Sequence, residues 1–357
     1  MSAKIVSNDR NHERQMLHEL IPLDTPFTIG IEPSGYCNLK CNFCIHSLPK
    51  DRMVELKHRF GIMEKATFDI LVKQLQGFPR KIKNIAFGCQ GEPLLNKELP
   101  HMVKQIRMND LADQILVITN GVLFNEKLSK NLLEAGLGKL YIKISVNGFS
   151  SADYHEITGS NIDFNSFFRN LMFLYENKGD AQISIKTMTT TLEVTGKTEQ
   201  EFYDVFGGLC DLISVENTVA CNSSINYKGT IDKTIHSQTN DAVPLSQTEI
   251  CSAPFMRLAI YNNGDVKICG LYASENEELT DNFLNTPVTA IWTGKKRQDL
   301  LIKLLHKQFN GIAIYCRDCD KRSSMTLKQD WLDPYAEEIL KRIYKSNSIN
   351  KCSKEIS

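Results

Sequence analysis

Apolar positions along the first 217 residues switch repeatedly between two spacings. Short apolar runs rich in Ile and Val are typical of buried strands, whereas Phe68, Leu71, Val72 and Leu75 recur at the spacing of a helix. The strands expected in this way cover residues 27–33, 82–88, 115–119, 140–146, 181–188 and 211–215, and the helices cover 63–78, 99–108, 127–135, 164–175 and 199–206. Because each strand–helix unit is too short to fold alone, the alternation predicts an α/β fold with a parallel sheet, curled into a partial (β/α)6 barrel.

The pattern changes after residue 217. Residues 219–244 are polar, rich in Asn, Thr and Ser, and have little periodicity. Further on, Asn262-Asn-Gly264 separates two apolar runs and predicts a β-hairpin, which two helices at 288–308 and 334–344 follow. We therefore divide the chain into an N-terminal extension, a core, an irregular connection, a small hairpin-plus-helix domain, and a C-terminal helix with a tail: residues 1–25, 26–217, 218–250, 251–330 and 331–357.

Charge and composition exclude several classes of protein. The chain has 42 basic and 42 acidic residues, so its formal net charge is zero and no electrostatic footprint for nucleic acid is expected. It has no apolar run of about 18 residues, which argues against a membrane partner, and its first residues are too polar for a signal peptide. The cysteines number 11 and are clustered, which favours metal binding in a reducing cytoplasm over disulfides.

Three of these cysteines, Cys37, Cys41 and Cys44, fall within eight residues. Their CxxxCxxC spacing suits three corners of a [4Fe–4S] cluster, whose fourth iron would then have no protein ligand. The alternatives are a structural zinc site, buried free thiols or a disulfide. Zinc usually takes two spaced pairs of ligands, and His46 lies too close to Cys44 to complete one tetrahedron comfortably.

Polar or turn-forming residues follow several expected strands. Besides the cysteine loop, these are residues 88–92, 119–121 and 145–148. In a parallel α/β fold the active site forms at the carboxyl ends of the strands. The sequence therefore predicts that these four segments meet in one site.

The cysteine loop, the strand order and the later cysteines together resemble the radical S-adenosylmethionine (radical SAM) superfamily, over residues 26–325. The resemblance implies a [4Fe–4S] cluster on Cys37, Cys41 and Cys44, whose open iron chelates the amino and carboxylate groups of S-adenosylmethionine. Phe43 matches the aromatic position that packs near the adenine in this family.

Two further motifs are similar to those of the superfamily. Gln90-Gly91-Glu92-Pro93 resembles its Gly-Gly-Glu-Pro turn, which implies that Gly91 and Glu92 bind the methionine amine, although Gln90 replaces the first glycine. Residues 145–148 are similar to a Ser-x-Asp-Gly segment of the family, with Asn147 at the position of the acid. The similarity implies that Ser145 and Asn147 contact the cofactor. By its place after the third strand, Asn120 is also expected to bind the cofactor.

A second cysteine set resembles the twitch or SPASM extension of these enzymes. In that extension one cysteine, a glycine-turned hairpin and a second cysteine precede a CxxC pair. The resemblance implies one auxiliary [4Fe–4S] cluster on four thiolates, those of Cys251, Cys269, Cys316 and Cys319. The same four thiolates could also make a zinc site, and spacing alone leaves that alternative open.

Three more residues are candidates for catalysis. Cys89 follows a strand near Glu92, and Cys221 lies in the polar connection; either could donate hydrogen, although free cysteines are more often buried apolar residues. Lys143 shares a strand face with Ser145 by two-residue alternation, and a lysine directed into a barrel needs a partner. It is therefore a candidate for contact with the substrate.

The resemblance implies an enzyme in which a 5′-deoxyadenosyl radical abstracts hydrogen from a small-molecule substrate. We expect a cytoplasmic oxidoreductase or epimerase acting on a hydroxyl-bearing carbon of a sugar- or cyclitol-like metabolite, with the auxiliary cluster as electron acceptor. An external donor such as flavodoxin or ferredoxin would reduce the first cluster. The alternatives are a maturase that modifies a ribosomal peptide and a zinc-stabilised binding protein without enzymatic activity.

Overall fold

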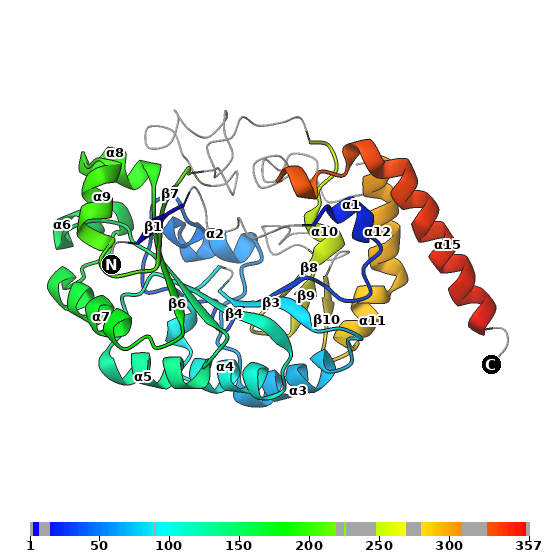
Figure 1. Ribbon diagram of the computed structural model, residues 1–357, viewed down its shortest axis with the longest axis horizontal. Helices are drawn as coiled ribbons and strands as arrows, with labels where there is room; N and C mark the ends of the chain where they lie inside the picture. Colours follow the sequence, from blue (N-terminus) through cyan, green and yellow to red (C-terminus); the bar gives the residue numbers. More distant parts are fainter. Residues whose placement is uncertain are drawn as a thin grey trace.

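A computed structural model of the chain describes residues 3–6, 15–88, 90–218, 225, 248–268, 280–308 and 327–354, with side chains to residue 345 in the last segment. In these segments ten strands form one sheet (Figure 1). The strands are β1 (Lys4–Ile5), β2 (Thr28–Ile31), β3 (Ile82–Phe87), β4 (Ala112–Thr119), β5 (Leu140–Ser145), β6 (Gln182–Met188), β7 (Leu212–Glu216), β8 (Arg257–Ile260), β9 (Asp265–Lys267) and β10 (Thr280–Asn282).

The strand order in the sheet is β1-β7-β6-β5-β4-β3-β2-β8-β9-β10. From β2 to β7 each strand pairs in parallel with the next strand along the chain, as the sequence predicts for a partial barrel. The strands β8, β9 and β10 form antiparallel pairs at one end of the sheet. The expected fold class, a parallel α/β sheet curled into a partial barrel with a small C-terminal extension, is confirmed.

Helices follow most of the parallel strands. They are α1 (Leu17–Leu20), α2 (Lys50–Glu55), α3 (Lys65–Leu75), α4 (Leu99–Met108), α5 (Glu126–Ala135), α6 (Ser151–Thr158), α7 (Phe164–Glu176), α8 (Thr189–Thr195), α9 (Glu199–Phe206), α10 (Ala253–Met256), α11 (Val288–Thr293), α12 (Lys295–Leu305) and α15 (Ala336–Lys354). Side-chain caps define several starts: Asn125 begins α5, and Thr198 with Glu201 makes a capping box at α9. No helix of the described segments is both long and apolar enough to cross a membrane.

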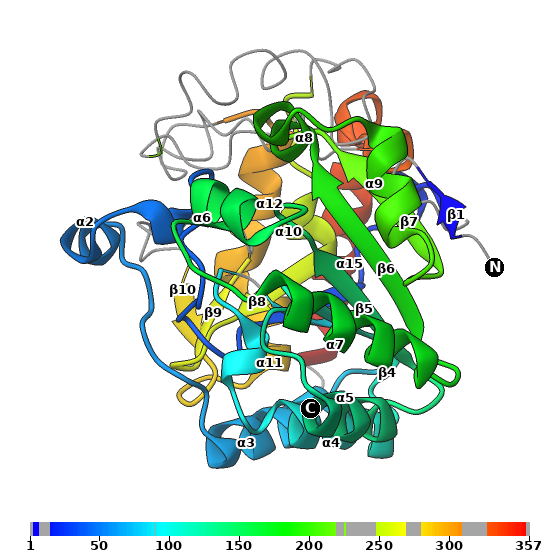
Figure 2. The same ribbon diagram turned by 90° about the vertical axis from the view of Figure 1, so that its left-hand side faces the viewer.

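The main hydrophobic core lies between the outer face of the sheet and α3, α4, α5, α7 and α9, which lie along one side of the strands (Figure 1, Figure 2). In β5, for example, Ile142 and Ile144 are fully buried in this core. Successive residues of a strand point to opposite faces, so Lys143 and Ser145 lie on the inner face. A second core joins α1, α10, α12 and α15 at the other end of the molecule.

Three features differ from the sequence-based expectation. The helix expected at 288–308 is two helices, because Gly294 has an extended backbone (φ −71°, ψ 155°) between α11 and α12. The strand β8 pairs in parallel with β2, so the C-terminal hairpin continues the core sheet. At the other edge β1 pairs in parallel with β7. Both pairings join segments far apart in the sequence, which local patterns do not reveal.

Candidate active site

The four segments that were expected to meet do so at the carboxyl ends of the strands. The turn after β3 is bonded to the end of β4, because the Glu92 carboxylate accepts hydrogen bonds from Thr119 Oγ1 (2.6 Å) and Asn120 N (2.8 Å). The end of β4 in turn contacts the cysteine loop, through Asn120 Nδ2 and the Asn38 side chain (2.8 Å). The loop after β5 reaches the same cysteine loop through Asn147. One continuous polar network thus joins the ends of β2, β3, β4 and β5.

The thiols of Cys37 and Cys41 are half-buried against the main core and accept amide hydrogen bonds. Asn120 Nδ2 lies 3.9 Å from Cys37 Sγ, and Asn147 Nδ2 lies 3.6 Å from Cys41 Sγ. Burial raises the pKa of Cys37 to about 11 and holds the pKa of Cys41 well above its usual value, with the neighbouring Cys44 and Cys37 raising it further. Amide donors beside such thiols are the hydrogen bonds that tune the sulfurs of iron–sulfur clusters.

The spacing of these thiols in the sequence predicts a cluster rather than a single zinc ion. Throughout the described part of the chain, no three side chains of His, Cys, Asp or Glu are grouped so as to hold one metal ion. Zinc requires its sulfur ligands at about 2.3 Å from a common centre, whereas a four-iron cluster takes each thiolate at a separate corner. Three soft thiolates, two of them with amide donors, are compatible with the cubic cluster expected from the spacing.

Glu92 is a buried acid of the site, with 2 % of its surface exposed. Besides Thr119 and Asn120, it accepts a bond from Leu94 N (3.0 Å) and so caps the short 3₁₀ helix Pro93–Leu95. Burial raises its pKa to about 7, although the three hydrogen bonds act in the opposite direction. A carboxylate has about four acceptor positions. The described partners use two on Oε1 and one on Oε2, so one position on Oε2 remains for a donor such as an ammonium group.

Gly91 is required by the close packing of the turn. A Cβ atom built on it would lie 2.0 Å from Ser34 O and 2.7 Å from Tyr36 O, both in the cysteine loop. Glu92 N donates to the same Tyr36 carbonyl (2.8 Å). The turn is therefore pressed against the backbone of the loop that carries Cys37, which explains why a glycine stands at this position.

The remaining expected cofactor contacts lie around the same network. Ser145 is half-buried at the end of β5, and Asn147 is buried, with its N donating to Tyr154 OH (3.3 Å). Phe43 is half-buried in the cysteine loop. Of these three residues, Asn147 contacts Cys41 through its side-chain amide, and Phe43 precedes Cys44 in the loop.

Lys143 has the partner that its inward position requires. Its Nζ lies 2.7 Å from Glu216 Oε1, and Lys186 Nζ lies 2.7 Å from Glu216 Oε2. We call Lys143, Lys186 and Glu216 the lysine–glutamate triad. Its three members come from the adjacent strands β5, β6 and β7, and Glu216 has 2 % of its surface exposed.

Lys186 and Glu216 were not predicted from the sequence. Two-residue alternation on β6 and β7 carries a signal, because Ile183, Ile185 and Ile213 are core residues and assign the other face to the two charged side chains. That the charges meet, however, depends on the register of the strands.

Several expected site residues lie outside the described part of the chain. They are the two proposed hydrogen donors and three of the four expected ligands of the auxiliary cluster: Cys89, Cys221, Cys269, Cys316 and Cys319. The fourth expected ligand, Cys251, is half-buried just before α10.

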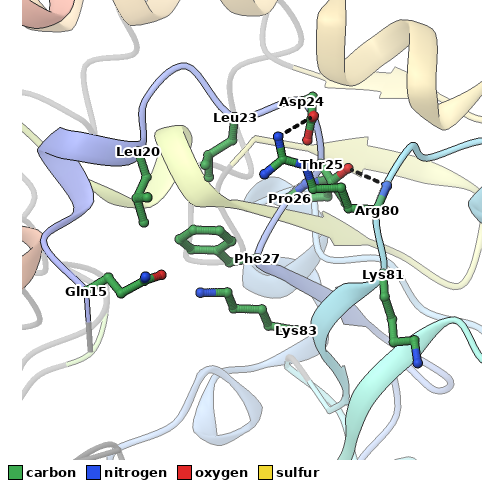
Figure 3. A pocket seen from close by; sticks show the side chains of 10 residues that line it. All are labelled: Gln15, Leu20, Leu23, Asp24, Thr25, Pro26, Phe27, Arg80, Lys81 and Lys83. Atoms are coloured by element: carbon green, nitrogen blue, oxygen red, sulfur yellow. Dashed lines mark hydrogen bonds and ion pairs between the residues drawn. The ribbon is translucent and has the colours of Figure 1, made fainter. Parts of the chain in front are cut away.

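A cavity of about 150 Å³ lies at the opposite end of the barrel, at the amino ends of β2 and β3 (Figure 3). Lys83 lies over the ring of Phe27 there (4.0 Å to the centroid), and Arg80 pairs with Asp24 (3.0 Å). The carboxyl ends of the strands, not this cavity, carry the groups expected to perform the chemistry.

Two sequence families match the chain. The radical SAM superfamily matches residues 31–207, and an iron–sulfur cluster-binding domain of the SPASM type matches residues 251–320, together more than two thirds of the chain. The two families imply S-adenosylmethionine and two [4Fe–4S] clusters as cofactors, in agreement with the cysteine sets found in the sequence.

Curated relatives match a smaller part. A probable GTP 3′,8-cyclase of Methanococcus vannielii is 32% identical over 137 residues, which are 38% of this chain and 41% of the relative. The GTP 3′,8-cyclase of Lactiplantibacillus plantarum is 33% identical over 127 residues, 35% of each protein. The chain therefore spans about two fifths or less of the length of these relatives.

Solved structures share the fold at low identity. The crystal structure of BtrN in complex with AdoMet and 2-DOIA has a TM-score of 0.53 at 19% identity, covering 85% of this chain and 97% of BtrN. Native anSMEcpe with bound AdoMet has a TM-score of 0.58 at 15% identity, covering 92% of this chain and 100% of anSMEcpe. At these identities the similarity concerns the fold alone.

The comparisons correct the reaction expected from the sequence. The predicted dehydrogenation or epimerisation of a sugar- or cyclitol-like metabolite, with peptide maturation as its alternative, is wrong, because the curated relatives are named GTP 3′,8-cyclases. The more general expectation of a radical enzyme that uses S-adenosylmethionine stands on the two families and on the geometry of the cysteine loop. This chain belongs to the radical SAM superfamily and carries a C-terminal SPASM-type iron–sulfur domain.

Proposed function

We propose that the chain cleaves S-adenosylmethionine reductively and starts a radical reaction on a purine nucleotide, in the manner that the name GTP 3′,8-cyclase describes for its curated relatives. When bound, the reduced cluster and S-adenosylmethionine supply a 5′-deoxyadenosyl radical, which takes a hydrogen atom from the substrate. The protein holds the reactants in place and keeps water away.

The observation that carries the first part of the proposal is the position of Glu92. This buried carboxylate keeps one acceptor position and is joined to Cys37 through Asn120. Cys37, Cys41 and Cys44 would hold the cluster, and Glu92 with the Gly91 turn would accept hydrogen bonds from the methionine amine. Ser145, Asn147 and Phe43 would contact the rest of the cofactor.

The lysine–glutamate triad supports an anionic substrate. Two ammonium groups meet one carboxylate at the carboxyl ends of β5, β6 and β7, so cationic groups outnumber the carboxylate within these three residues. The side chain of Lys186 is the more accessible of the two lysines, 18% exposed against 8% for Lys143. We propose that Lys186, backed by Lys143, binds a phosphate group of the nucleotide.

The other expected components are part of the same proposal. Cys251, Cys269, Cys316 and Cys319 would hold the auxiliary cluster, and a flavodoxin or ferredoxin would reduce the first cluster. Cys89 and Cys221 remain proposed hydrogen donors. Clusters and free thiols of this kind suit the reducing conditions of the cytoplasm.

Anaerobically purified protein tests the proposal in two stages. With dithionite it should cleave S-adenosylmethionine to 5′-deoxyadenosine, and Cys41→Ala should abolish the cleavage, whereas Cys210→Ala, at a core cysteine, should retain it. Cleavage that persists in Cys41→Ala would overturn the first stage. In the second stage GTP should be consumed only when S-adenosylmethionine is present. If the cofactor is cleaved and GTP is unchanged, the nucleotide part of the proposal is wrong.

A further inference from the structure

Gln90 replaces a glycine of the family's turn. Its backbone N–H, its backbone carbonyl and its side-chain amide all have hydrogen-bond partners. Its backbone N donates to Glu32 Oε2 (3.3 Å), and its carbonyl oxygen accepts from His46 Nε2 (2.9 Å). Its side-chain amide contacts His58 Nδ1 (3.0 Å). A glycine at this position would lose the contact with His58, so this part of the packing is specific to a chain with Gln90.

The protonation of His58 decides how the amide is oriented. His58 Nε2 lies 2.7 Å from the Gly35 carbonyl and must donate to it. Burial lowers the pKa of His58, so the ring is neutral and has a single donor. Nδ1 is therefore an acceptor, and Gln90 presents its NH₂ group to it, the reverse of the amide orientation in the structure. One neutral histidine thus ties Gln90 to the start of the cysteine loop.

A second set of hydrogen bonds connects Gln90 to the C-terminal hairpin. Asn262, in the turn between β8 and β9, donates to Glu32 Oε1 (2.9 Å) and to the Arg59 carbonyl (2.9 Å). Glu32 is 1% exposed, and its other oxygen accepts from Gln90 N. A hydrogen-bonded path therefore runs from the hairpin through Glu32 to Gln90.

We propose that Gln90 is a positioning residue that, clamped by His58 and linked through Glu32 to Asn262, holds the Gly91–Glu92 turn in the form that binds S-adenosylmethionine. This inference rests on the proposed role of that turn. Because the clamp orders the turn before the cofactor arrives, binding costs less conformational entropy. The SPASM-type domain thereby contributes to cofactor binding through its hairpin.

A double-mutant cycle on Gln90 and His58 tests the clamp. His58→Ala alone and Gln90→Gly alone should each weaken S-adenosylmethionine binding by about tenfold, the effect of one to two lost hydrogen bonds. The double variant should be no more than about threefold weaker than Gln90→Gly, because His58 then has no side-chain amide to hold. Additive losses would overturn the clamp, since they would mean that His58 acts only through Gly35.

Amide hydrogen exchange of residues 88–95, in protein without S-adenosylmethionine, is the second readout. Exchange should accelerate in His58→Ala, Gln90→Gly and Asn262→Ala. The matched control is His101→Ala, which removes another half-buried histidine, paired with Asp69 on the outer surface (3.0 Å), and should change neither readout. Unchanged exchange in all three variants would refute the clamp.

The two readouts separate this inference from the proposed function. If the wild-type protein does not bind S-adenosylmethionine, the proposed function fails, and the exchange data still decide whether the turn is clamped. If the wild type binds and the cycle shows no coupling, only the clamp fails. Iron content measured in every variant identifies a loss of binding that results from loss of the cluster.

Discussion

Glu216 and Glu32 are two buried carboxylates at opposite sides of the row of strand ends, and their partners differ in kind. Glu216 meets two ammonium groups at 2.7 Å. The direct partners of Glu32 are uncharged N–H donors, from Gln90 and Asn262, and Arg59 and Lys267 act on it through charge only. The β5–β7 side is therefore built from paired charges. The β2–β9 side is built from directional bonds that fix a backbone.

The largest effect is expected at Glu216. Glu216→Ala removes the carboxylate shared by the buried Lys143 and the half-buried Lys186, so we expect the free energy of unfolding to fall by about 3–5 kcal/mol. Urea denaturation followed by circular dichroism measures it. A loss below about 1 kcal/mol would show that the lysines find other partners and that the triad is not the stabilising unit on this side.

The more buried of the two lysines should contribute more to the free energy of unfolding. Lys143→Met and Lys186→Met keep the apolar stem and remove one hydrogen bond to Glu216, which still has the other lysine. We expect losses of about 1–3 kcal/mol in unfolding free energy, larger for Lys143, whose side chain is 8% exposed against 18% for Lys186. The reverse order would make Lys186 the anchor and Lys143 the more available group.

The raised pKa of Glu32 should make the stability of the protein depend on pH. Burial raises the pKa of Glu32 from 4.5 to about 8. Between these values the unfolded chain has lost the proton that the folded chain keeps, so this group lowers stability as pH rises, by at most about 1.4 kcal/mol per pH unit. Glu32→Gln has no such proton, so its stability relative to the wild type should increase from about pH 5.5 to about pH 8.

Denaturation of both proteins at several pH values measures this trend. Glu92, whose pKa is also raised, is present in both and cancels if the two sites are independent. A difference that is constant with pH would show that Glu32 is ionised throughout, and the two sides of the barrel would then be alike.

The smallest effect is expected at an exposed carboxylate. Glu201 pairs with Lys197 at 2.9 Å on α9, with both side chains more than 40% exposed. Glu201→Asp keeps the charge, and solvent screens the pair, so the denaturation midpoint should stay close to that of the wild type. A shift as large as that of Glu216→Ala would mean that burial does not explain the contrast.

The core of the fold could be predicted from the sequence because its signals are local. Each of the strands β2 to β7 overlaps an expected segment, since each is an apolar run beside a helical period. The pairings of β8 with β2 and of β1 with β7 could not be predicted, because hydrogen bonding between distant strands leaves no local pattern.

The candidate site likewise contains residues that could be predicted from local motifs and residues that could not. The residues within motifs, such as Cys37 and Glu92, were identified from their spacing and their place after a strand. The partners of Lys143 and Gln90 were not, because Glu216 and His58 lie 73 and 32 residues away in the sequence, and only the register and the packing bring them together.

The pairing of β8 with β2 also determines when the sheet can be completed during synthesis of the chain. Arg257, the partner of Thr28, is synthesised about 230 residues after it. At about 5–20 residues per second this takes roughly 10 to 50 s. During that interval β2, which leads into the cysteine loop, has no neighbour on one edge. The edge of the sheet beside the cysteine loop is therefore completed only after β8 has been synthesised.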